Sequence, residues 1–170
     1  RPADRTVPMT RSTEPAATES AEAYLQATWH REIPITAPMG LEVVAFDGSA
    51  LHIRAGLDEN RNVHGTGFAG SLYAISALAG WGLLHLVMRA AGEANSIVIA
   101  DGRIRYHKPV TTDIDARCSV ADDPAFADGL ARFRETGRAR FDLRATIGDP
   151  SSPLAEFEGT YAVIRPKSGH

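Results

Sequence analysis

The chain has 170 residues, of which 44% are hydrophobic and 23% charged, and its net charge is -3 at pH 7. These values are typical of one globular domain with a substantial core. The acidic balance, without a long basic run, argues against nucleic acid as a partner. The single cysteine, Cys118, excludes an internal disulfide and a cysteine metal cluster, so we expect no metal site and a reducing cytoplasm, and nothing indicates a cofactor.

The first residues, 1–17, mix Pro, Thr, Ser and charged side chains without periodicity, which predicts a disordered tail. We expect a single domain over residues 18–166. From Thr18 to Glu22, hydroxyl and acidic side chains are typical of a helix start, and Pro34 is expected to end this short amphipathic helix.

Two strands and a polar loop come next. Residues 40–46 and 50–57 are predicted strands, and the turn Asp47-Gly48-Ser49 between them is of the Asp-Gly type that favours a hairpin. The polar loop from Asp58 to Gly67 then runs directly into an apolar stretch.

This apolar stretch, from Phe68 to Ala91, is predicted to be one long helix that is hydrophobic nearly all round. Apolar residues recur in it at steps of three and four, namely at Leu72, Ile75, Ala79, Leu83 and Leu86. At about 22 residues it is long enough to cross a bilayer. Three glycines, the mid-helix His85 and the neighbouring strands instead favour the core helix of a water-soluble domain, so we expect no membrane.

Strands dominate the rest of the chain. The segment from Ser96 to Val110 is predicted as one long strand with a bulge at Asp101-Gly102, in preference to a hairpin. Further strands are expected over 113–120, 137–147 and 153–164, with a surface helix or long excursion over 124–137.

The last two of these strands are expected to form a hairpin with its turn near Gly148 to Ser152. That turn would place Arg144 opposite Glu156 or its neighbour and Arg140 near Glu158 or Thr160.

The order of elements predicts an α+β domain in which one curved antiparallel sheet wraps around one long central helix. A helix of this length is about as long as a six-stranded sheet is wide, at ~4.8 Å per strand. Such a sheet leaves its outer face and its edges uncovered, and dimerisation is a common remedy.

The loop from Asn60 to Phe68 is where uncharged polar groups and glycines gather. It brings Asn60, Asn62, His64, Thr66 and Ser71 to the start of a buried helix, where free N–H groups and the positive dipole end suit an oxyanion or a polarised carbonyl. In the alternative interpretation, Asn60 and Asn62 form Asx turns and His64 is an ordinary loop residue. The residues alone leave both interpretations open.

Several residues have plainer expected roles. Ser71 is expected to cap the helix rather than to act as a nucleophile, because no Gly-x-Ser-x-Gly motif surrounds it. Cys118 is expected to be a core residue, and Tyr73 and Trp81 are expected mainly to pack.

In combination, the segments NRNVHGTGFAGSLYAISALAGWGLL and RYHKPV resemble the hot-dog-fold thioesterase superfamily, and most of all the thioesterase family found alone or as the C-terminal domain of YiiD-type acyltransferases. The resemblance covers about residues 20–165. It rests on an Asn-x-Asn loop, a Thr-x-Phe-x-Gly-Ser helix start, an Ala-Gly-Trp helix centre and a strand that ends in Arg-Tyr-x-x-Pro. In this chain these are Asn60/Asn62, Thr66/Phe68/Gly70/Ser71, Ala79/Gly80/Trp81 and Arg105/Tyr106/Pro109.

The resemblance implies a homodimer, or a pair of such dimers, that hydrolyses acyl-CoA or acyl-carrier-protein thioesters at the dimer interface. We expect a cytoplasmic enzyme of fatty acid metabolism that acts on a fatty or aryl acyl thioester. It implies that the thioester carbonyl meets the backbone N–H of Gly70 or Ser71 and that a carboxylate, often on the partner's helix, activates water. This chain departs from that pattern, since it has no Asp or Glu between Phe68 and Ala91 and the nearest is Glu93.

Asn62 and His64 are therefore the expected substitutes that position and deprotonate the water, because the ordinary pKa of histidine, near 6.5, suits a base at neutral pH. The other expected substrate-binding residues are Asn60, Thr66, Phe68, Tyr73, Ser76, Arg105 and Lys108. The missing carboxylate also allows a non-catalytic acyl- or CoA-binding module. A hot-dog dehydratase is a weaker alternative, because those enzymes also carry an acidic residue on this helix.

Overall fold

The central helix, α2 (Ala69–Ala90), is the axis of this computed structural model, which describes residues 19–166. The expected disordered tail, 1–17, lies outside the described residues. As predicted, Leu72, Ile75, Ala79, Leu83 and Leu86 are buried. By length and composition α2 meets the criteria for a membrane span, but 56% of its most apolar window is buried inside the protein, and core helices of soluble proteins meet the same criteria.

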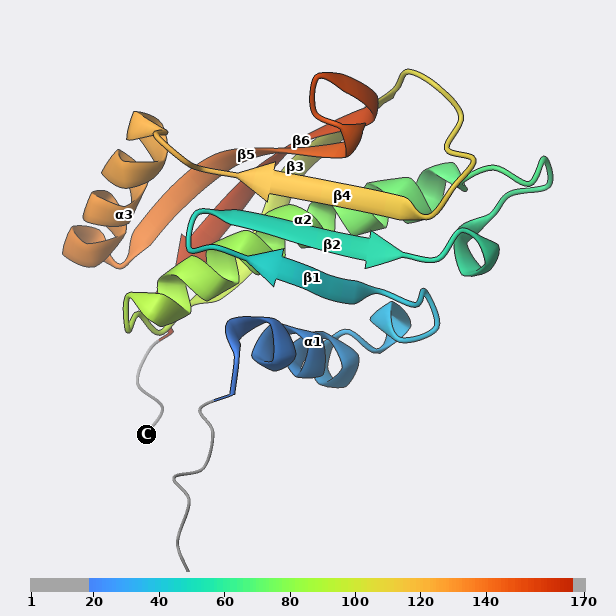
Figure 1. Cartoon of the computed structure of the whole chain (residues 1–170). Helices are drawn as coiled ribbons and strands as arrows, with labels where there is room; N and C mark the ends of the chain where they lie inside the picture. Colours follow the sequence, from blue (N-terminus) through green and yellow to red (C-terminus); the bar gives the residue numbers. More distant parts are fainter. Residues whose placement is uncertain (1–18, 167–170) are drawn as a thin grey trace, which may run out of the picture.

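A six-stranded antiparallel sheet wraps around α2 in the order β1-β2-β4-β5-β6-β3 (Figure 1). This arrangement confirms the α+β class and the hot-dog architecture. The bounds of the strands are β1 Glu42–Phe46, β2 Ala50–Ala55, β3 Ser96–Tyr106, β4 Ile114–Ser119, β5 Arg138–Asp149 and β6 Ser152–Ile164.

The strand β3 is one long element, as predicted, with an irregular register between Ile99 and Asp101 rather than a hairpin. The excursion before β5 is the helix α3 (Pro124–Thr136), which begins after Asp123 and ends at Gly137. Asp123 accepts hydrogen bonds from two N–H groups of the first turn, and Gly137 adopts a φ of 72°, which is a common way for a helix to end.

Close packing explains two of the glycines in α2. A Cβ atom on Gly82 would lie 2.6 Å from Cζ2 of Trp29, and one on Gly80 would lie 2.7 Å from Cζ of Tyr161. Trp29 belongs to α1 (Ala21–Glu32), which is capped by Ser20 as predicted and closes one end of the core. The Tyr161 hydroxyl donates a hydrogen bond to the carbonyl oxygen of Ala77 at 2.7 Å.

The predicted register of the last hairpin was wrong by two residues. Arg144 pairs with Glu158, and Arg140 pairs with Ala162. The cause is a bulge between Ile147 and Gly148 together with a tight turn between Asp149 and Ser152. Because side chains alternate with a period of two, this shift keeps the predicted inward set buried.

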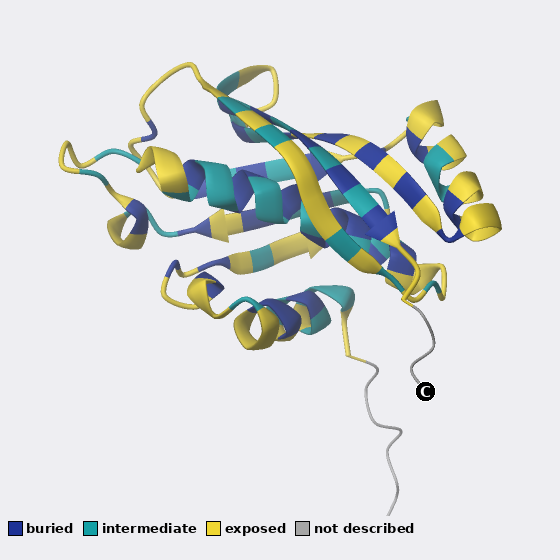
Figure 2. Ribbon diagram, turned by 180° about the vertical axis from the view of Figure 1, so that it is seen from behind, coloured by how far each residue is buried: buried dark blue, intermediate teal, exposed yellow. Residues whose placement is uncertain are grey.

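One side of α2 is not wrapped by the sheet. Along it, a set of mostly apolar residues is half-buried at helical spacing: Ala74, Ala77, Leu78, Trp81 and His85. Figure 2, which views the molecule from behind, shows the half-buried positions along this helix. The outer strand β3 runs beside them and exposes Val98 and Ile99. This apolar side of the molecule, which we call the open face of α2, is available for contact with another protein surface.

Candidate functional site

The loop before α2 is organised by the side chain of Asn62. Its Oδ1 accepts hydrogen bonds from the backbone N–H groups of His64 (2.9 Å) and Thr66 (3.2 Å), and its Nδ2 donates to Oγ1 of Thr66 (3.0 Å). Gly65 at the tip has a φ of +73°, a conformation that favours glycine. Asn62 thus forms the Asx turn of the plainer interpretation and fixes the shape of the loop.

Asn60 has a different role, although it belongs to the same motif. Only 2% exposed, it donates from Nδ2 to the carbonyl oxygens of Met39 and Gly56, both at 2.8 Å. The backbone carbonyl oxygen of Asn60 accepts a hydrogen bond from the N–H of Phe68 at 2.7 Å. Asn60 therefore anchors the base of the loop, at the end of the 3-10 turn η2 (Asp58–Asn60), and does not contact the surface where a substrate would lie.

A hollow of about 330 Å³ opens where three segments meet: the loop, the first turn of α2 and the end of β3. The loop contributes Asn62, Thr66 and Gly67, α2 contributes Ala69 and Leu72, and the chain after β3 contributes Tyr106 to Val110. Two hydrogen bonds of 2.8 Å connect the segments. The N–H of Gly67 donates to the carbonyl oxygen of Val110, and the hydroxyl of Tyr106 donates to the carbonyl oxygen of Ala69.

The first turn of α2 begins beside this hollow. The cap residue is Phe68, which offers no side-chain acceptor, and the first N–H bonded back to it is that of Leu72. The prediction that Ser71 caps the helix was wrong, because α2 starts at Ala69 and Ser71 lies inside its first turn. The N–H groups of Ala69, Gly70 and Ser71 therefore have no helical acceptor and form the positive end of the helix dipole.

The ring of Phe68 folds back over this first turn. A Cβ atom on Gly70 would lie 2.5 Å from Cε1 of that ring, so only glycine fits there without moving Phe68. Phe68 as a whole is 52% exposed. Phe68 therefore forms an apolar wall beside the free N–H groups.

The remaining predicted residues are spread more widely. His64 is exposed at the loop tip, and only its backbone takes part in the described hydrogen bonds. Ser76 is buried, and Tyr73 packs edge-on against Phe157 deeper along α2. Arg105 is exposed on β3 and pairs in register with Glu156, whereas Lys108 lines the hollow. The structure thus brings Asn62, Thr66 and Lys108 to the hollow.

The nearest acidic residue in sequence after α2 cannot serve this hollow within one chain. Glu93 lies beyond the opposite end of α2, about 33 Å away at 1.5 Å per residue. There it forms ion pairs with Arg165 (3.2 Å) and Arg134 (3.7 Å). The thiol of Cys118 is also unsuited to chemistry, because burial raises its pKa to about 12.

Sequence reasoning had not assigned a catalytic role to His107, which also lines the hollow. Its Nε2 donates to Oε2 of Glu156 at 2.8 Å, so a carboxylate orients the imidazole. A base oriented by a third group is a recurring arrangement in enzymes. The RYHKPV segment was a signal for this residue, but the pairing with Glu156 depends on the sheet register.

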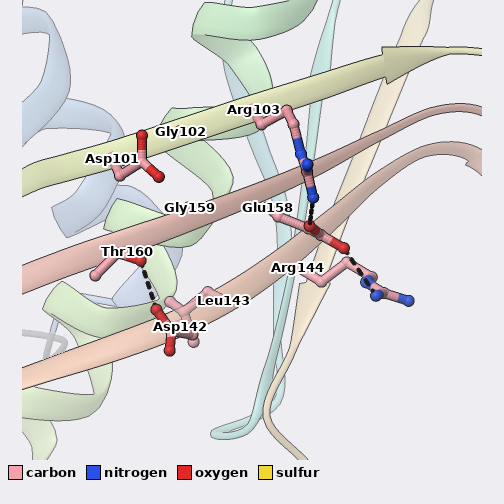
Figure 3. A pocket seen from close by; sticks show the side chains of 9 residues that line it. All are labelled: Asp101, Gly102, Arg103, Asp142, Leu143, Arg144, Glu158, Gly159 and Thr160. Atoms are coloured by element: carbon pink, nitrogen blue, oxygen red, sulfur yellow. Dashed lines mark hydrogen bonds and ion pairs between the residues drawn. The ribbon is translucent and has the colours of Figure 1, made fainter.

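A larger hollow, of about 720 Å³, lies on the outer face of β3, β5 and β6 (Figure 3). Most charged side chains that line it form ion pairs or hydrogen bonds with one another. Glu158 accepts from Arg103 (2.9 Å) and Arg144 (3.0 Å), and Asp142 accepts from the hydroxyl of Thr160 (2.5 Å). These exposed pairs lie on the side of the sheet away from α2, so we assign the candidate site to the smaller hollow.

The fold, with an uncapped helix start facing a hollow, is that of the hot-dog proteins of the thioesterase type. Residues 22–165 match the family model described as "Putative thioesterase (yiiD_Cterm)", and the chain belongs to this family.

Solved structures agree with this assignment. The chain is similar to a protein of unknown function from Chlorobaculum tepidum, with 31% identity, 85% of this chain and 94% of that chain covered and a TM-score of 0.81. It is also similar to a putative thioesterase from Shewanella oneidensis, with 30% identity, 85% and 97% covered and a TM-score of 0.76. A thioesterase from Haemophilus influenzae, 16% identical with 90% and 96% covered and a TM-score of 0.67, shares the fold.

Proposed function

We propose that this protein hydrolyses an acyl thioester of CoA or of an acyl carrier protein at the start of α2. The observation that carries the proposal is the set of free N–H groups at Ala69, Gly70 and Ser71, in the first turn of a helix whose residues Ala69 and Leu72 line the hollow, in a chain of the thioesterase family. Free N–H groups at a helix start are suited to an oxygen that gains negative charge.

In the proposed reaction, the thioester carbonyl oxygen accepts from the N–H of Gly70 or Ser71. Water attacks the carbonyl carbon, the oxyanion is stabilised by these donors and by the helix dipole, and the C–S bond then breaks. A base takes the proton from water and returns it to the departing thiolate, which leaves a carboxylic acid and a thiol. Asn62 acts by holding the loop in shape, as its hydrogen bonds suggest.

Two imidazoles are candidates for the base, since α2 carries no carboxylate. His64 is the residue expected from the sequence. His107 has the stronger geometric support, because it lines the hollow and is oriented by Glu156. Lys108, an exposed cation that lines the same hollow, is suited to a phosphate of CoA or of a phosphopantetheine arm.

The site is proposed to be completed by a second copy of the chain. The open face of α2 and the outer strand β3 together expose Val98 and Ile99 beside half-buried Trp81 and His85. Covering such a face with its two-fold copy removes an apolar patch and a free strand edge from water. The acyl chain would then run along α2, past Tyr73 and toward Ser76.

A panel of acyl-CoAs of increasing chain length and an acylated carrier protein would test hydrolysis, with the released thiol measured by a chromogenic reagent. We expect turnover that depends on acyl chain length. We also expect analytical ultracentrifugation to show that the active protein is a dimer. A folded dimer that turns over none of these substrates would refute the proposal. If mass spectrometry then showed intact acyl-CoA bound, the non-catalytic binding module would replace it.

A further inference from the structure

The hydroxyl of Tyr106 donates a hydrogen bond to the carbonyl oxygen of Ala69 at 2.8 Å. This carbonyl and the N–H of Gly70 belong to the same peptide group, which is planar. The contact therefore acts on the group that carries one of the proposed oxyanion donors.

We propose that Tyr106 is a positioning residue that orients and polarises the Ala69–Gly70 peptide, so that the N–H of Gly70 becomes a stronger and better aligned donor to the oxyanion. This inference rests on the proposed hydrolysis. Two physical effects support it. Fixing the oxygen of a planar group fixes the direction of its N–H, and a peptide that accepts a bond at its oxygen donates more strongly from its nitrogen.

The surroundings of Tyr106 suit this role. The residue comes from the end of β3, lines the hollow together with the loop, and is 49% exposed. A hydroxyl so close to water has little need of this particular partner for stability. Partial burial, with Tyr73 nearby, raises the pKa of Tyr106, so the phenol keeps its proton and acts as a donor at neutral pH.

The chain offers a matched control in Tyr161. Its hydroxyl also donates to a carbonyl oxygen of α2, that of Ala77, at 2.7 Å. Tyr161 is 1% exposed, and the peptide it contacts lies in the middle of the helix, where the following N–H is used by the helix itself. Loss of this hydroxyl removes a similar hydrogen bond without touching the free N–H groups at the helix start.

The test compares Tyr106→Phe with Tyr161→Phe. Removing an oxyanion donor typically costs ~10²–10³ in kcat, and cooperative strengthening changes a hydrogen bond by ~10–30%. From these values we expect Tyr106→Phe to lower kcat about two- to eightfold, with KM and the midpoint of thermal unfolding nearly unchanged. Tyr161→Phe is expected to lower the unfolding midpoint and to leave kcat unchanged. Equal kcat in Tyr106→Phe and wild type would overturn the role in the reaction.

Nuclear magnetic resonance supplies a readout that does not depend on turnover. In Tyr106→Phe, the carbonyl carbon of Ala69 and the amide proton of Gly70 should both move upfield, whereas in Tyr161→Phe the carbonyl carbon of Ala77 should move instead. Unchanged shifts at Ala69 and Gly70 would overturn the inference. A wild type that hydrolyses no thioester would refute the proposed function, and these shifts would still decide whether Tyr106 holds and polarises this peptide.

Discussion

Replacing Asn62 by alanine should lower kcat far more than it changes KM. The side chain makes hydrogen bonds to the N–H of His64, to the N–H and hydroxyl of Thr66 and to the carbonyl oxygen of Gly67, the last at 3.4 Å. At ~0.5–1.5 kcal/mol each, these four bonds favour the ordered loop by about 2–6 kcal/mol. If that preference is lost, the fraction of molecules with a formed site falls by about 30-fold at the lower end of this range and by about 10⁴-fold at the upper end.

The bond to Gly67 is long and therefore weak, so the loss lies near the lower end of this range and we expect a decrease of about 10²-fold in kcat. The assay is the initial rate on the best thioester, together with thermal unfolding to show that the fold is kept. Asn62→Asp is the matched variant, since its carboxylate can still accept from the N–H groups of His64 and Thr66. It should retain much of the rate. The reasoning fails if Asn62→Ala keeps the wild-type kcat and kcat/KM.

Four further substitutions test the base, the packing of α2 and its open face. His107→Ala should lower kcat strongly if His107 is the base, whereas His64→Ala should do so only if His64 is the base. The initial rates of the two variants decide between them. Gly82→Ala should cost about 1–3 kcal/mol through its clash with Trp29 and lower the unfolding midpoint by several degrees, and an unchanged midpoint would contradict that packing. Burial, with Arg89 nearby, lowers the pKa of His85 below 6.5 in the folded protein. As the pH falls, the unfolded chain therefore binds a proton at His85 at a higher pH than the folded protein does. Stability should therefore fall as pH drops below about 6.5, and His85→Gln should weaken this dependence in denaturant titrations at pH 7 and pH 5.

The fold was predictable because its signals are local and repeated. The apolar spacing of α2 and the strict alternation along β5 each involve many residues. One residue that departs from the pattern therefore does not change which face is predicted to be buried. The hairpin register was wrong because the tight turn from Asp149 to Ser152 and the bulge between Ile147 and Gly148 each shift the pairing by one residue, and neither leaves a pattern in composition.

The candidate site was predictable only in part. The loop could be found from its polar residues and glycines, yet Asn60 and Asn62, two positions apart, differ completely in burial and in partners. Tyr106 and His107 line the same hollow as the loop because the end of β3 lies beside the start of α2. Their hydrogen-bond partners, Ala69 and Glu156, are remote in sequence. Such pairings depend on sheet topology, which local patterns do not contain.

The sheet order also has a consequence for biosynthesis. The strand β3 has a single neighbour, β6, and Ser96 of β3 pairs with Ile164 at the end of that strand. During translation, the interstrand hydrogen bonds of β3 therefore cannot form until β6, the last described strand, has been synthesised. Until then the nascent chain carries an apolar α2 beside an unpaired strand, a state that favours chaperone binding and aggregation.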